Sequence, residues 1–388
     1  MSKTNCPIAK KCGGCQYLNM NYSDQLDKKQ KQMRLLFDKY CHIEKIIGMD
    51  NPYNYRNKIH RVFHHKKGSE IIAGIYEEGT HNVLPAKECF IEDVRAAAII
   101  TDLCKLFSSF KMKAYNEDTG YGLIRHVMIR TGRVTGEIMV VIVTSSPVFP
   151  SKNNFAKALM KLHPEITTIV HNINDKKTNM VIGKRNISLY GKGYIEDILC
   201  GKKFRISPQS FYQINSLQTE KLYGKAIEYA GLKGDEVVFD AYCGIGTIGI
   251  VASDYAGEVI GVELNEDAVK DAVNNAKINN VKNISFYAND AGRFITNFAA
   301  NNNPNDENSK KINVVFMDPP RNGSSEEFIN AVHKLMPEKV IYISCGPDTL
   351  ARDLKLLCKG DRYKVKKICP VDMFPFTNKC EVVALLEK

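Results

Sequence analysis

The second half of the chain predicts an α/β fold built on a Rossmann-like, doubly wound and mainly parallel sheet. From residue 237 onward, short apolar runs alternate with amphipathic stretches of helical periodicity, as in repeated strand–helix units. Three of these runs end in a glycine-rich turn, an acidic residue and a cysteine. Because ligands bind at the carboxyl ends of such strands, the three segments predict a single site.

The elements of this half follow from the same alternation. Strands are predicted at 237–239, 259–263, 284–287, 314–317 and 340–343, and helices near 247–255, 266–279, 291–299, 325–336 and 348–357. Apolar runs at 363–368 and 380–386 predict an antiparallel terminal pair. A further helix is expected to open within 207–215, where Pro208 suits a first turn, and to run to about residue 229. The asparagine-rich stretch 299–311 predicts a surface loop.

The first half predicts a different architecture, an α+β region in which most strands are antiparallel. Strands are expected at 59–64, 71–76, 127–130, 137–144 and 166–172, with helices at 94–110 and 155–162. A basic amphipathic helix is expected at 23–40. The run 55–61 combines Tyr55 with Arg56, Lys58 and Arg61, which suits RNA, although a protected edge strand would have the same pattern.

The charge is distributed unevenly between the two halves. The chain has a formal net charge of +11, and residues 1–205 hold 33 of its 54 lysines and arginines but only 19 of its 43 acids. This asymmetry indicates either an N-terminal half that binds a polyanion or a solvated basic surface. With 25% charged and 44% hydrophobic residues, and without a membrane span or signal peptide, the chain is expected to be a soluble cytoplasmic protein.

The cysteines near the N-terminus predict a metal centre. Cytoplasmic thiols stay reduced, so the 12 cysteines are not expected to form disulfides. Cys6, Cys12 and Cys15 follow a C-x5-C-x2-C spacing, and a four-thiolate site needs one further ligand. Cys89 is the best candidate, ahead of Cys41 and Cys104. Both an iron–sulfur cluster and a structural zinc fit this set.

The glycine-rich turn predicts an adenosine-containing cofactor. Gly244, Gly246 and Gly249 match G-x-G-x-x-G after a strand, and Glu263 ends the next strand, where it could hold ribose hydroxyls. NAD fits this pattern taken alone. Asp240 and the segment DPPR at 318–321 favour S-adenosylmethionine instead, since acids can hold its cationic sulfonium and amino groups.

Several motifs together resemble one family. The cysteines named above are followed in order by SPQSFYQIN, DAYCGIG, DPPRNG, ISCGP and DMFPFTNKCE. This set resembles the S-adenosylmethionine-dependent RNA 5-methyluridine methyltransferases, in particular the bacterial iron–sulfur-containing branch that acts on 23S rRNA. The resemblance covers almost the whole chain.

The resemblance implies a role for each matching residue. Cys345 would be the nucleophile that adds to C6 of uracil, and Glu381 the base that removes the C5 proton. The positions that match cofactor contacts are Gln213, Tyr242, Gly244, Glu263, Asp290 and Asp318. The four ligands of a [4Fe–4S] cluster would be Cys6, Cys12, Cys15 and Cys89.

The chain also departs from the family pattern. Phe376 and Lys379 stand where relatives usually carry histidines, and Cys380 replaces a valine, although Glu381 is retained. The small N-terminal RNA-binding β-barrel of some relatives is not expected, because Cys6 lies almost at the start.

The expected organisation has three parts: a cluster-bearing basic region at 1–92, a central RNA-binding α+β domain at 53–205 and a methyltransferase domain at 206–388. The expected partner is RNA, most of all 23S rRNA, with the T-loop of tRNA (uridine 54) second, and the chain is expected to be a monomer. Two other classes stay open at this point: an NAD-linked iron–sulfur oxidoreductase and a non-catalytic RNA-binding protein on the same fold.

Overall fold

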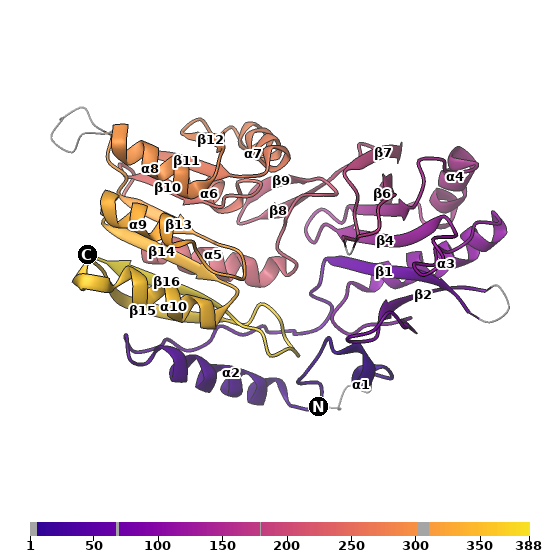
Figure 1. The fold of residues 1–388 in the computed structure, drawn as a ribbon, viewed down its shortest axis with the longest axis horizontal. Helices are drawn as coiled ribbons and strands as arrows, with labels where there is room; N and C mark the ends of the chain where they lie inside the picture. Colours follow the sequence, from indigo (N-terminus) through magenta and orange to yellow (C-terminus); the bar gives the residue numbers. More distant parts are fainter. Residues whose placement is uncertain (1–5, 67–69, 179, 302–309) are drawn as a thin grey trace.

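The computed structural model describes residues 6–66, 70–178, 180–301 and 310–388. Within these ranges the chain forms two seven-stranded sheets that lie side by side, with a two-stranded hairpin between them (Figure 1). Most of the predicted surface loop at 299–311, namely residues 302–309, lies outside the described residues. No helix in the described ranges is both long and apolar enough to cross a membrane.

The C-terminal sheet has the strand order β12-β11-β10-β13-β14-β16-β15. Its strands are β10 (Val237–Ala241), β11 (Glu258–Glu263), β12 (Ile284–Ala288), β13 (Val314–Met317), β14 (Lys339–Ser344), β15 (Lys364–Val371) and β16 (Glu381–Glu387). The first five run parallel to one another, whereas β16 pairs antiparallel with both β14 and β15. The predicted α/β class and the antiparallel terminal pair are therefore confirmed.

Helices cover both faces of this sheet. They are α5 (Ser216–Ala230), α6 (Thr247–Ala252), α7 (Glu266–Ile278), α8 (Ala291–Asn301), α9 (Glu326–Leu335) and α10 (Pro347–Leu357). Alternate strand residues point into two separate cores, as period-2 side chains must. On β10, for example, Val238 belongs to the core under α5 and α6, and Phe239 to the core under α8 and α9.

The helix predicted to open within 207–215 begins later than expected. That segment is irregular, and α5 starts at Ser216 after Asn215, whose side chain accepts a hydrogen bond from the Gln218 amide at 3.3 Å. Asparagine is a strong N-cap because its carbonyl oxygen satisfies an amide at the open helix end. This cap, rather than Pro208, marks the helix start.

The N-terminal sheet has the order β3-β2-β1-β4-β5-β6-β7 and is antiparallel except between β5 and β6. Its strands are β1 (Lys58–His65), β2 (Ile71–Tyr76), β3 (Val83–Pro85), β4 (Ile124–Thr131), β5 (Ile138–Thr144), β6 (Ile166–Ile173) and β7 (Arg185–Tyr190). Two helices, α3 (Val94–Ser109) and α4 (Lys152–Leu162), pack against one face. The other face turns towards the C-terminal half.

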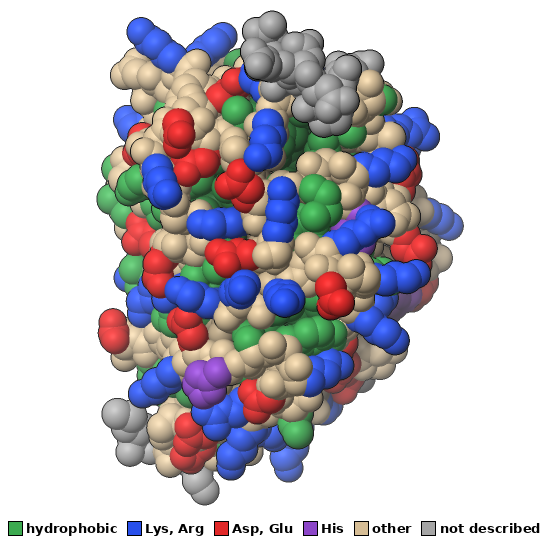
Figure 2. All heavy atoms as spheres, turned by 90° about the vertical axis from the view of Figure 1, so that its left-hand side faces the viewer, with side chains coloured by type: hydrophobic (Ala, Val, Ile, Leu, Met, Phe, Trp, Pro, Cys, Tyr) green, Lys and Arg blue, Asp and Glu red, His purple; other side chains and the backbone are tan. Residues whose placement is uncertain are grey.

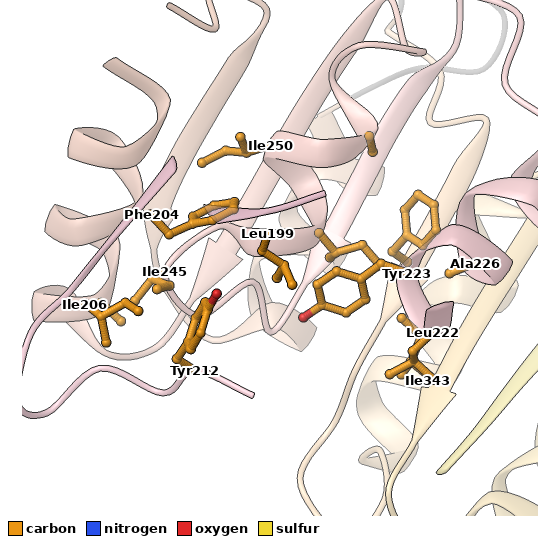
Figure 3. Close-up of a cluster of buried hydrophobic side chains, with 14 of the residues drawn as sticks. Leu199, Phe204, Ile206, Tyr212, Leu222, Tyr223, Ala226, Ile245, Ile250 and Ile343 are labelled. Carbon is orange, nitrogen blue, oxygen red and sulfur yellow. The ribbon is translucent and has the colours of Figure 1, made fainter. Parts of the chain in front are cut away.

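A hairpin joins the two sheets. Its strands, β8 (Ile195–Leu199) and β9 (Lys202–Ile206), are connected by Cys200 and Gly201, both with positive φ, as tight hairpin turns require. Figure 3 shows Leu199 and Phe204 of the hairpin beside Ile245 and Ile250 of the C-terminal half. Met128 and Val141 of the N-terminal sheet belong to the same buried cluster, so one core spans both halves.

The N-terminal segment docks on the C-terminal sheet. After the short α1 (Ala9–Cys12), helix α2 (Tyr22–Phe37) lies along β15 and α10 (Figure 1). Met33 and Phe37 are buried in the core beneath α9 and α10, and Ile43 forms a β-bridge with Ile368. The predicted division at residues 92 and 205 stays a prediction, but residues 22–47 pack with the C-terminal half.

Figure 2 shows the end of the molecule that carries the C-terminus, where lysines and arginines lie interspersed with acids. Exposed pairs such as Lys311 with Glu338 contribute to this mixture. The mixed surface agrees with the near-balanced charge of residues 206–388, which hold 21 basic and 24 acidic side chains.

Candidate active site

Three chemically active side chains meet at the carboxyl edge of β13 and β14. Asp318 directly follows β13, Cys345 directly follows β14, and Glu381 is the first residue of β16. The parallel register pairs Met317 with Tyr342, and the antiparallel register pairs Ser344 with Val382. The next position therefore places Cys345 opposite Glu381, with Asp318 on the neighbouring strand.

The electrostatic environment of this edge is unusual. Glu381 is 3% exposed, and burial, followed by the charge of Asp318, raises its pKa to about 8. Burial raises the pKa of Asp318 to about 7. Burial also raises the pKa of the Cys345 thiol, and the charges of Glu381 and Asp318 add to this effect. Titratable groups with such shifts, gathered at a strand-end crevice, are typical of active sites.

Arg321 is a member of this site that the sequence reasoning did not single out. Its charge lowers the pKa of both Cys345 and Glu381, opposing the effect of burial. The sequence feature that could have identified Arg321 is its position in the DPPRNG segment, three residues after Asp318. A cation here favours the thiolate and the carboxylate, which are the forms that can act as nucleophile and base.

The glycine-rich turn after β10 opens towards the end of β11. Tyr242, Gly244 and Gly246 all have positive φ. A Cβ on Gly244 would meet no atom within 4 Å, so the backbone borders open space there. The Gly244 amide donates a hydrogen bond to Glu263 Oε2 at 3.1 Å, and the Asn265 amide donates to Oε1 at 2.9 Å.

The other two glycines serve close packing. A Cβ on Gly246 would lie 2.7 Å from the ring of Phe286, and a Cβ on Gly249 would lie 2.7 Å from Asp240 Oδ2. Asp240 is 1% exposed, and its Oδ2 has no hydrogen-bond partner among the described residues. Burial raises the pKa of Asp240 well above its ordinary value.

A cavity of about 530 Å³ lies beside the turn, between the two halves of the molecule. It is lined by Gly244 and Glu263 together with Phe211, Asn265, Lys184, Arg205 and other residues. Of the six predicted cofactor contacts, only Gly244 and Glu263 border this cavity. A glycine loop and a carboxylate at one cavity wall fit a nucleoside with ribose hydroxyls.

The remaining predicted cofactor contacts have other surroundings. The phenol of Tyr242 lies 3.3 Å from Ser324 Oγ, and Asp290 accepts a hydrogen bond from the Arg293 amide at 2.9 Å at the start of α8. Gln213 is buried, and its backbone oxygen accepts from Asn57 at 3.0 Å. Their roles as cofactor contacts stay predictions.

The four N-terminal cysteines lie in one neighbourhood. Cys6, Cys15 and Cys89 are partly buried against the same apolar cluster, and burial followed by the charges of Cys89, Cys12 and Cys6 raises the pKa of Cys15 to about 12. Within the described residues, however, no group of three or more His, Cys, Asp or Glu is arranged to hold a metal ion. The predicted cluster is therefore not shown.

The segment before Glu381 is held by the N-terminal region. Phe376, where the resemblance led us to expect a histidine, has a φ of 68°, and its ring packs against Tyr53 with the ring centroids 5.1 Å apart and the planes tilted by 38°. Its amide donates to Gln25 at 2.8 Å, and its carbonyl accepts from the Tyr17 amide at 2.9 Å. The aromatic ring thus serves packing, whereas Lys379 is exposed.

Comparison with known proteins agrees with this geometry. A family model described as tRNA (Uracil-5-)-methyltransferase matches residues 21–388. The chain belongs to this family. An uncharacterized RNA methyltransferase of Clostridium tetani is 41% identical over 98% of the chain and 82% of its own length. One from Bacillus cereus is 38% identical over 99% and 82%.

A solved structure extends the comparison to the fold. The Pyrococcus abyssi tRNA (uracil-54, C5)-methyltransferase, in complex with S-adenosyl-L-homocysteine, matches with a TM-score of 0.79 and 28% identity. The match covers 96% of this chain and 85% of that one. Membership of the uracil-5-methyltransferase family identifies the chain as an S-adenosylmethionine-dependent RNA methyltransferase. This family membership excludes the alternative prediction of an NAD-linked iron–sulfur oxidoreductase.

Proposed function

We propose that the chain methylates C5 of a uridine in 23S rRNA through a covalent intermediate on Cys345, with Glu381 as the base. The observation that supports this most directly is the pairing of β14 with β16, which sets the thiol opposite a buried carboxyl group. Burial raises the pKa of Glu381 to about 8, so its ionised form is a stronger base than an ordinary carboxylate.

The proposed mechanism uses these two groups in turn. The Cys345 thiolate adds to C6 of uracil, which places negative charge on C5 and O4 and makes C5 a nucleophile. S-adenosylmethionine supplies the methyl group that C5 takes up. Glu381 then accepts the C5 proton, the C5–C6 double bond re-forms, and the bond between sulfur and C6 breaks. The thiolate is thereby regenerated, and the uridine must leave any base stack to reach it.

The residues present fit S-adenosylmethionine. The carboxylate of Glu263, bordering the cavity beside the open backbone of Gly244, suits the ribose, and the unpartnered Oδ2 of Asp240 is a buried acceptor at the same strand end. The carboxyl groups suit the cationic part of the molecule. We assign Gln213, Tyr242, Asp290 and Asp318 to the same cofactor on the family pattern.

We further propose that Cys6, Cys12, Cys15 and Cys89 hold a [4Fe–4S] cluster with a structural role. Four thiols that influence one another electrostatically are a chemically suitable donor set. Methyl transfer from a sulfonium needs no electrons. The cysteines share their apolar cluster with Phe376, so a cluster there would stiffen the segment that leads to Glu381.

Transfer RNA is the second candidate substrate. The matching Pyrococcus enzyme acts on uracil 54 of tRNA, and it covers nearly the whole chain. The preference for 23S rRNA comes from the cysteine motif, whose resemblance is to the cluster-bearing bacterial branch. The chain is proposed to act as a monomer without an obligate protein partner.

A methylation assay with the purified chain tests the proposal. Unmodified 23S rRNA and tRNA transcripts are incubated with S-adenosylmethionine carrying a labelled methyl group, and 5-methyluridine is measured by mass spectrometry. We expect the label in one or a few uridines of 23S rRNA, and none with Cys345→Ala. Cys358→Ser is the matched control, because Cys358 caps the far end of α10, and it should retain full activity. Label in tRNA alone would reverse the choice of substrate, and label in neither RNA would contradict the proposal.

A further inference from the structure

A group of cations lies on one face of the N-terminal sheet, apart from the catalytic edge. Lys58, the first residue of β1, pairs directly with Arg130 of β4 in the strand register. His60 is two residues further along β1 and so faces the same side, but its ring is neutral, because burial and then the charge of Lys58 lower its pKa to about 3. Arg56 precedes the strand, and its Nε donates to the Lys58 carbonyl at 2.9 Å.

Lys58 and Arg130 have no carboxylate to balance them in the described part of the chain. Within the described residues, the Lys58 ammonium makes neither a hydrogen bond nor an ion pair, although the side chain is only partly exposed. Burial, followed by the charges of Arg130 and Arg56, lowers the pKa of Lys58 to about 7, and no carboxylate takes part. By contrast Arg61, on the opposite face of β1, pairs with Glu92.

Buried donors in this group are also left unused. Arg130 is 2% exposed, and its Nε has no hydrogen-bond partner in the described ranges. The buried Nδ1 of His60, which donates in one tautomer of the neutral ring and accepts in the other, lacks one as well. Buried cations are normally paired, and buried donors are normally bonded, because desolvation without compensation is costly. The arrangement is one that an anion would complete.

The position of this group links it to the catalytic half. Arg130 donates a hydrogen bond to the carbonyl of Ser210. The amide of Asn57, between Arg56 and Lys58, donates to the Ile214 carbonyl at 2.9 Å. The cations therefore border the segment 210–214, which contains the predicted cofactor contact Gln213 and leads into α5.

We propose that Lys58 and Arg130, with Arg56 at the rim, form a phosphate-binding site that takes one phosphodiester of the RNA backbone. Guanidinium and ammonium groups are the usual partners of phosphate oxygens, and a phosphate fixed here would set the register of the strand beside the catalytic half. The assignment of this phosphate to RNA rests on the proposed function. The anion site itself rests only on the arrangement of these side chains.

Two measurements on the full chain test this site. Lys58→Met keeps most of the apolar stem and removes the charge. Lys157→Met is the matched control, because Lys157 is exposed on α4, which covers the opposite face. The first measurement compares thermal unfolding in sodium sulfate and sodium chloride at equal ionic strength. Sulfate should add stability to the wild type and to Lys157→Met beyond what it adds to Lys58→Met.

The second measurement is the dissociation constant for 23S rRNA fragments as a function of salt. For Lys58→Met we expect binding about tenfold weaker at low salt and a log–log salt dependence shallower by about one. Lys157→Met should match the wild type. If Lys58→Met does not yield folded protein, Lys58→Gln replaces it in both measurements.

The two measurements separate the possible failures. Equal sulfate stabilisation of all three proteins would overturn the anion site. A sulfate effect that depends on Lys58, with unchanged RNA affinity and salt slope, would overturn its assignment to an RNA phosphate and leave a site for a free anion. A wild type that shows the sulfate effect but methylates neither RNA would contradict the proposed function and not the anion site.

Discussion

The buried ion pair between Lys29 and Asp372 connects α2 to the segment that leads to Glu381. Lys29 Nζ donates to Asp372 Oδ1 at 2.6 Å and to the Phe374 carbonyl at 3.1 Å, and both charged side chains are fully buried. The Tyr22 hydroxyl donates to the other carboxylate oxygen at 2.9 Å. Lys29→Met would leave a buried carboxylate with one hydroxyl donor and no cation.

The expected cost follows from this loss of compensation. Removing one partner of a buried ion pair costs about 3–5 kcal/mol, because the remaining charge stays desolvated. The double variant Lys29→Met/Asp372→Asn should recover part of this cost, since the neutral amide can still accept from Tyr22. An exposed pair provides the control: Lys270 Nζ and Asp267 Oδ1 lie 3.0 Å apart on α7, and Lys270→Met should have no measurable cost, because water screens both charges.

The assay is urea unfolding followed by circular dichroism, because the chain contains no tryptophan to report by fluorescence. The midpoint should fall clearly for Lys29→Met, less for the double variant, and not measurably for Lys270→Met. Methyl transfer by Lys29→Met should also slow, because Phe374 and the following residues lose an anchor. Equal small effects of Lys29→Met and Lys270→Met would refute the reasoning.

Four further predictions concern the site and the cysteines. The pKa of Glu381 is about 8 in the folded chain, above its ordinary value of 4.5. Between pH 4.5 and pH 8 the folded chain therefore keeps a proton that the unfolded chain has released. The free energy of unfolding falls as the pH rises through this range. Glu381→Gln should therefore abolish turnover yet stabilise the chain at pH 8, by up to about 4 kcal/mol, with no gain at pH 4, as thermal unfolding would measure. Arg321→Met should raise the pKa of both the thiol and the base, and shift the rising limb of the pH–rate profile to higher pH; an unshifted limb would count against its role. Gly246→Ala should weaken cofactor binding in calorimetry, because its Cβ would lie 2.7 Å from an aromatic ring and its φ is 81°; unchanged affinity would contradict this. Cys12→Ala should lose iron and RNA affinity together, and normal RNA binding after complete iron loss would exclude a role of the cluster in holding RNA.

The sequence predicted the features that depend on local pattern. The alternation after residue 237 located the parallel strands, and the residues at their ends, Asp318 and Cys345, were found because strand ends meet at one edge of a sheet. The role of Glu381 was predicted only from the resemblance to the family, since an acidic residue at the start of a strand does not by itself indicate a catalytic base. The register of β14 with β16 then explained its position.

What the sequence did not predict depends on contacts between distant segments. The docking of α2 on β15 was missed, because an amphipathic helix does not reveal which apolar surface it will cover. The hairpin of β8 and β9 was missed because its strands are short and its turn, Cys200–Gly201, lacks the common asparagine or aspartate. The pairing of Lys58 with Arg130 joins residues of two strands far apart in the chain, so only the sheet register could reveal it.

The central claim is that Cys345 forms a covalent bond with the target uracil, and trapping that bond tests it most directly. The chain is incubated with S-adenosylmethionine and 23S rRNA transcripts in which 5-fluorouridine replaces uridine, then denatured and analysed by mass spectrometry after nuclease and protease digestion. Fluorine at C5 cannot leave as a proton does, so Glu381 cannot complete the reaction and the adduct should accumulate. We predict a methylated 5-fluorouridine attached to the peptide that contains Cys345, and no adduct with Cys345→Ala. An adduct that persists in Cys345→Ala, or methylation of normal RNA without any trapped adduct, would contradict the account.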